Sequence, residues 1–197
     1  MIRKIPIILI ILGLGLIGIS GYQFLKTNKA QKDSLVFAYD VLAAPVEKEG
    51  PRKPVDFSPH DGEVVGVLDI PQINANLAII EGTDTDELAK GVGHLKESAY
   101  PAQNNQIVLS GHRDTVFRRM GELNIGDELI ISLPYGRYTY KITDTRIVEA
   151  NDMTVIKNTF PHEELVLTTC YPFTYVGNAP ERYIITALPV DNEEIEQ

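Results

Sequence analysis

One strand-like run of this chain ends in its single cysteine; it reads Leu165-Val166-Leu167-Thr168-Thr169-Cys170 and leads directly into Tyr171-Pro172. Short runs of apolar and β-branched residues that stop at a proline are typical of buried strands. The proline restricts Tyr171 to extended or turning conformations, so the chain leaves the strand here. Seven further runs of this kind cover residues 64–70, 77–80, 107–110, 128–133, 138–142, 145–148 and 182–188.

The residues between these runs predict the fold class. Pro71, Gly82, Gly126 and Pro172 are among the breakers that separate the runs, and only 84–89 and 116–123 have the pattern of short helices. Eight short strands with so little helix between them indicate an all-β fold, either a barrel or a sandwich.

The N-terminus has a different composition. Ile5–Leu25 is a stretch of 21 residues without a charged side chain, and at about 1.5 Å per residue a helix of this length crosses a bilayer. Arg3 and Lys4 favour a cytoplasmic N-terminus, although three lysines soon after Leu25 weaken the charge asymmetry. A cleaved signal peptide is the alternative, but the run is long for one. We therefore expect an uncleaved transmembrane anchor, with the rest of the chain outside the cytoplasm.

These patterns predict a simple organisation. A cytoplasmic N-terminus (1–4) and the anchor (5–25) precede a juxtamembrane stalk (26–62), one globular domain (63–190) and an acidic tail (191–197). The stalk is of mixed charge and contains four prolines. Residues 35–42 could form a short helix against the domain, but the prolines that follow limit how far such a helix continues.

The charge of the chain excludes one class of partner. All 27 acidic residues lie from Asp33 onward, so residues 33–197 carry 13 basic against 27 acidic groups. Nucleic acid binding relies on Lys and Arg that neutralise phosphates, so we expect no nucleic acid partner. The single cysteine also excludes an internal disulfide and a metal site with several thiolates.

Cys170 has two interpretations at this stage. A lone cysteine is commonly a small buried hydrophobe, but a thiol at a strand end is also well placed to act as a nucleophile. A nucleophilic thiol needs a proton partner, because at neutral pH only a few per cent of ordinary thiols are ionised. His112 is the best placed histidine, since it follows the strand 107–110 through Gly111. We expect His60 and His162 to be solvated and His94 to be structural.

Arg182 lies twelve residues beyond Cys170, at the start of the run 182–188. If that run and 165–170 are neighbouring strands, the guanidinium lies within reach of the sulfur and can stabilise an oxyanion. The alternative is an ordinary surface arginine paired with Glu181 or another nearby acid.

Two strings resemble the motifs of a known family. Leu109-Ser110-Gly111-His112-Arg113-Asp114-Thr115 and Leu167-Thr168-Thr169-Cys170, with Arg182 downstream, look like sortases, the cysteine transpeptidases of Gram-positive cell surfaces. The longer strings 112–118 and 169–173 most resemble class D. The resemblance spans 63–189, and the N-terminal anchor agrees with it.

The resemblance implies an eight-stranded sortase-type β-barrel preceded by a transmembrane helix. It implies that Cys170 is the nucleophile, His112 the general acid and base, and Arg182 the residue that positions substrate or stabilises the transition state. The implied reaction cleaves an LPxT-type sorting signal after Thr, forms a thioester, and transfers the acyl chain to a cell-wall amine such as the peptide stem of lipid II. A peptidase that mainly hydrolyses the signal and a catalytically silent binding module are the alternatives.

Two smaller expectations concern ligands. The acidic residues Asp84, Asp86 and Glu87 have no match to the calcium ligands of another sortase class, so we expect no metal and no cofactor. The residues Tyr171, Phe173, Tyr175 and Val176 either line a groove for the substrate or pack against the barrel.

Overall fold

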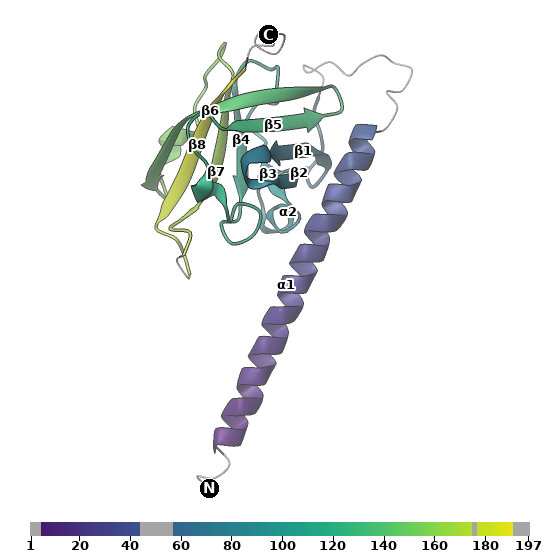
Figure 1. Ribbon diagram of the computed structural model, residues 1–197, viewed down its shortest axis with the longest axis vertical. Coiled ribbons are helices and arrows are strands. Elements are labelled where there is room, and N and C mark those ends of the chain that lie inside the picture. Colours follow the sequence, from purple (N-terminus) through teal and green to yellow (C-terminus); the bar gives the residue numbers. More distant parts are fainter. Residues whose placement is uncertain (1–4, 44–56, 175–176, 191–197) are drawn as a thin grey trace.

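The computed structural model describes residues 5–43, 57–174 and 177–190. Eight strands close into one barrel, in the order β1-β2-β3-β4-β7-β8-β6-β5 (Figure 1). They are β1 (Val64–Ile70), β2 (Ala75–Glu81), β3 (Val92–His94), β4 (Gln106–Gly111), β5 (Glu128–Leu133), β6 (Gly136–Glu149), β7 (Glu164–Tyr171) and β8 (Glu181–Pro189). The predicted all-β barrel is confirmed.

Alternation along the strands builds the core of the barrel. Leu68, Leu109, Leu129 and Leu167 come from four different strands, and each is at most 1% exposed. Since successive side chains of a strand point to opposite faces, every second residue of these strands enters the core. The pattern that predicted the strands therefore also supplies the main hydrophobic core.

Two strands differ from expectation. The runs 138–142 and 145–148 are one strand, β6, because a register shift between Ile142 and Asp144 accommodates the polar residues between them. The short strand β3 was not predicted, since two glycines flank Val92 and weaken the signal. Gly93 lets β3 lie close to the segment after β2, because a Cβ at Gly93 would lie only 2.4 Å from the carbonyl oxygen of Gly82.

The expected short helices are reduced. The segment 84–89 contains α2 (Thr85–Leu88), while 116–123 is mostly turn and ends in the 3₁₀ helix η4 (Met120–Glu122). Two other 3₁₀ helices, η3 (Pro71–Ile73) and η5 (Met153–Val155), lie in connections between strands.

The helix α1 (Ile5–Ala43) extends well beyond the apolar stretch and differs from the expected stalk. Leu35, Ala38 and Leu42 pack on a patch of β1 and β2 formed by Val64, Val67, Ala78 and Ile80. Their spacing of three and four residues places them on one helix face. No proline lies between Pro6 and Pro45, so nothing in the sequence interrupts the helix before it reaches the barrel.

The N-terminal part of α1 projects away from the barrel (Figure 1). This helix is long and apolar enough to cross a membrane, and its most apolar segment of 18 residues is not buried against the barrel. From the rest of the expected stalk, Phe57 is a core residue and contacts Tyr100 and Tyr135 edge to face. The predicted acidic tail lies outside the described residues.

Candidate active site

Three neighbouring strands bring the predicted site residues together. β4 and β7 are parallel, and Gly111 pairs with Thr169, so His112 and Cys170 are the next residues on each strand path. β7 and β8 are antiparallel, and Cys170 pairs directly with Arg182. Adjacent strands lie about 4.8 Å apart. Cys170 therefore lies between His112 on one side and Arg182 on the other.

The same three residues share one face of the sheet. Thr169 is 3% exposed and its Oγ1 donates a 2.7 Å hydrogen bond to the carbonyl oxygen of Gly111, on the core side. Cys170 follows Thr169 and therefore points to the outer side. Cys170, His112 and Arg182 are all partly exposed. A thiol and a guanidinium thus share a face that a substrate can reach, and His112 follows directly after the strand beside them.

Backbone contacts orient the Arg182 guanidinium. Its Nη1 donates hydrogen bonds to the carbonyl oxygens of Glu181, at 2.9 Å, and Ala179, at 3.3 Å. Within residues 5–43, 57–174 and 177–190, no carboxylate lies within ion-pairing distance of this guanidinium. The alternative of an arginine paired with the Glu181 carboxylate is therefore not what the structure has.

The loop that begins at His112 is closely packed. The His112 carbonyl oxygen accepts hydrogen bonds from the backbone N–H groups of Phe117, at 3.0 Å, and Thr115, at 3.4 Å. A Cβ at Gly111 would lie 2.5 Å from the Phe117 ring and 2.8 Å from Val116, so only glycine fits before the histidine. These contacts hold the backbone of His112 in place.

A side chain joins the two loops at this end of the barrel. Arg113 Nη2 donates a 2.8 Å hydrogen bond to the carbonyl oxygen of Gly177, in the connection between β7 and β8. The loop after His112 is thereby tied to the loop that follows Cys170.

A groove continues from the site along the outer face of the sheet. It has a volume of about 160 Å³, and Ser110, Thr168 and Arg182 line it nearest the cysteine. Further along the strands its floor is apolar, formed by Val108, Val166 and Ile184, and residues of and after η5 form a wall. This floor was not predicted, although the alternation of outward and core-facing residues along β7 carries the signal.

The aromatic residues after Cys170 pack on the barrel. Phe173 and Tyr183 contact the main core, and Tyr171 lies 5.5 Å from the Phe173 ring and 6.1 Å from the Tyr183 ring, between centroids. None of the three lines the groove described above. For Phe173 the packing interpretation therefore holds, while Tyr175 and Val176 lie outside the described residues.

His94 is a structural histidine, as expected. It is 1% exposed and stacks on Tyr100. Its Nδ1 lies 2.7 Å from a Glu81 carboxylate oxygen, and its Nε2 lies 2.9 Å from the Ala99 carbonyl oxygen. Tyr100 is also buried, and its hydroxyl donates a hydrogen bond to Glu81; burial and this bond raise the pKa of Tyr100. His60 and His162 are exposed, and of the four histidines only His112 directly follows a strand that pairs with β7.

Comparison with known proteins identifies the family. The family model described as "Sortase domain" matches residues 68–190, which include all three predicted site residues. The chain belongs to the sortase family. Sortases are cysteine transpeptidases, so the enzyme class follows from membership.

Individual relatives narrow the class. This sortase is 50% identical to Sortase D of Bacillus subtilis (strain 168) over 190 residues, which are 93% of this chain and 96% of the relative. Such identity over nearly the full length supports class D. Sortase A of Streptococcus agalactiae is 28% identical over 136 residues, 65% of this chain and 53% of that protein.

Solved structures agree with the fold. A Clostridium perfringens Sortase D5 transpeptidase superimposes with a TM-score of 0.71 at 23% identity, covering 82% of this chain and 99% of that one. Sortase C from Clostridium perfringens SM101 gives a TM-score of 0.62 at 27% identity, over 84% of this chain and 89% of the other. The barrel is therefore a sortase barrel.

Proposed function

We propose that this sortase is anchored in the cell membrane by α1, cleaves an LPxT-type sorting signal after Thr, and transfers the acyl chain to a cell-wall peptide amine. The observation that carries the proposal is the position of Cys170 between His112 and Arg182, at the end of an apolar groove. Cys170 is the nucleophile, His112 the general acid and base, and Arg182 the oxyanion donor.

The first half of the reaction breaks the amide bond. The Cys170 thiolate attacks the carbonyl carbon of the substrate threonine, and the oxygen of that carbonyl becomes negative. The Arg182 guanidinium donates hydrogen bonds to this oxygen. Protonated His112 then donates a proton to the nitrogen that leaves, the C–N bond breaks, and a thioester on Cys170 remains.

The second half transfers the acyl group. Neutral His112 takes a proton from the incoming amine as that amine attacks the thioester carbonyl. The C–S bond breaks, the thiolate of Cys170 is restored, and a new amide is formed.

The groove on the outer face suits the apolar part of the signal. The exposed apolar side chains of its wall, Met153 and Ile156, contact the Leu-Pro side chains over a floor that is nearly fully buried. Ser110 and Thr168 lie nearer the scissile bond. Burial of apolar surface here supplies binding free energy, since each buried methylene contributes about 0.8 kcal/mol.

The docked helix supports a reaction at the membrane surface. The loop joining β7 to β8, which follows Cys170, lies at the end of the barrel toward which the N-terminal part of α1 extends (Figure 1). Val116, four residues after His112, lines one pocket together with Asn28, which is three residues beyond the apolar stretch. With the N-terminus cytoplasmic, this arrangement holds the site on the outer side, close to the bilayer.

The test is product analysis of the full chain in detergent, with LPxT peptides and an added amine. We expect an amine-ligated product, lowered at least about 100-fold by His112→Ala and unchanged by the matched variant His162→Ala. Cleavage without ligation would favour a peptidase, and no product with any such peptide would favour a binding module. We also propose that no metal or cofactor takes part, so EDTA should leave the rate unchanged.

A further inference from the structure

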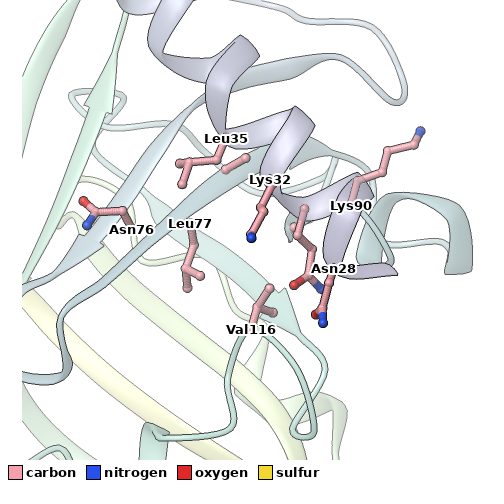
Figure 2. Close-up of a pocket in the computed structure, with 10 residues that line it drawn as sticks. Asn28, Lys32, Leu35, Asn76, Leu77, Lys90 and Val116 are labelled. Atoms are coloured by element: carbon pink, nitrogen blue, oxygen red, sulfur yellow. The ribbon is translucent and has the colours of Figure 1, made fainter. Parts of the chain in front are cut away.

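A pocket of about 380 Å³ lies where α1 meets the barrel, away from the groove of the active site (Figure 2). One wall is the helix, from Asn28 to Leu35, and the opposite wall is β2 with Leu77. The loop that begins at His112 closes it through Val116. Its volume is within the range of small-molecule sites.

The polar lining is suited to an anion. Two lysines and three side-chain amides line the pocket and no carboxylate does, in a chain with 27 acidic residues. Lys32 extends its ammonium group into the pocket, whereas the ammonium group of Lys90 points away from it (Figure 2). Within the described ranges, neither lysine makes an ion pair.

One donor in the pocket lacks an acceptor. The Nε2 atom of Gln31 is buried and has no hydrogen-bond partner among residues 5–43, 57–174 and 177–190. Leaving such a donor unpaired is unfavourable, since burial removes its bonds to water. A ligand with negatively charged oxygens supplies both the missing acceptor and a partner for Lys32.

The position of the pocket indicates where that ligand comes from. Asn28 and Leu35 follow the end of the apolar stretch at Leu25 by three and ten residues, or about 5 and 15 Å along the helix axis. The headgroup layer of a bilayer is roughly 5–8 Å thick on each side. Asn28, at the lower end of the pocket, is therefore level with the lipid phosphates once α1 spans the membrane. Gln31 and Lys32 lie about 9 and 10 Å beyond Leu25 along the axis, and side chains of a helix tilt back toward its N-terminus, that is, toward the phosphates.

We propose that this pocket binds the phosphate of an anionic membrane lipid headgroup, held by the ammonium group of Lys32 and the amide of Gln31. Leu35, Leu77 and Val116 provide apolar contacts for the carbon atoms next to the phosphate. The inference rests on the anchoring proposed above. A lipid in this position would contact the loop that carries His112.

The experiment is native mass spectrometry of the full chain, released from detergent and titrated with phosphatidylglycerol. We expect one retained lipid, bound about tenfold more weakly in Lys32→Gln and more weakly in Gln31→Leu, which removes the donor at similar volume. Lys29→Gln is the matched control, because Lys29 is exposed on the same helix and does not line the pocket.

Three results would overturn the proposal. One is the absence of a retained lipid, and another is equal weakening by Lys29→Gln, which would indicate general charge attraction. The third is displacement of the lipid by excess inorganic phosphate that itself binds through Lys32, because the site would then take free phosphate. Retention of the lipid in excess phosphate supports the lipid source.

Peptide turnover in lipid-free detergent separates this inference from the proposed function. Lys32→Gln should turn over a soluble peptide at the wild-type rate, because Lys32 is not part of the catalytic site. If native mass spectrometry detects no retained lipid while the peptide is turned over, only the lipid pocket is refuted. If the lipid is retained but no peptide is turned over, only the transpeptidase mechanism is refuted.

Discussion

The hydrogen bond from Thr169 to Gly111 joins the strand of the nucleophile to the strand of the catalytic histidine. Thr169→Val removes the 2.7 Å bond from a residue that is 3% exposed, at nearly constant volume. The buried Gly111 carbonyl oxygen then loses the hydroxyl that donates to it, which lowers the free energy of unfolding by about 1–3 kcal/mol. His112 is the next residue, so we also expect kcat to fall about tenfold while KM changes little.

The assay pairs denaturant unfolding with steady-state kinetics on one LPxT peptide. Thr186→Val on β8 is the matched control, because the Thr186 side chain makes no hydrogen bond among the described residues. A loss of stability with unchanged kcat would show that the bond is purely structural. If neither quantity differed from the control, the reasoning that links Gly111 to the position of His112 would be refuted.

Three other predictions follow from the site and from the docked helix. Arg182→Lys keeps the charge but loses the planar donor fork, so kcat should fall about 100-fold in the same assay; a normal rate would show that charge suffices. Ile156→Asp places a charge in the groove wall and should raise KM about tenfold, unlike Ile147→Asp outside the groove. A chain that begins at Phe57 loses the helix cover of Val67 and Ile80, so by calorimetry its Tm should be at least about 5 °C lower than that of a chain beginning at Lys26.

The barrel and the site residues were predictable because their signals are local. Alternating apolar runs gave seven of the strands, with β6 read as two, since a strand buried on one face repeats every two residues. Cys170, His112 and Arg182 each lie at a strand end, and the pairing of Cys170 with Arg182 follows from the expected neighbouring strands.

The long helix, the strand β3 and the groove were harder to predict, because they depend on contacts between segments that are far apart in the sequence. A helix over 35–42 against the domain was foreseen as an option, and the structure has it, with Leu35, Ala38 and Leu42 packed on the barrel. Its continuity with the anchor was not predicted, because the mixed charge of 26–34 resembles a stalk. The strand β3 has three residues and is held by two neighbours, so its own propensity is weak. The outward residues of β7 follow from its alternation, but the wall of the groove does not, because it depends on η5 packing against them.

The central claim is that Cys170 carries the acyl group, and mass spectrometry of the digested protein tests it most directly. The full chain is mixed with an LPxT peptide without an amine, quenched in acid and digested. We predict a mass increase equal to the acyl fragment on the peptide containing Cys170, removed by hydroxylamine and absent in Cys170→Ala. Turnover of the peptide by Cys170→Ala, or an adduct on any other residue, would contradict the claim.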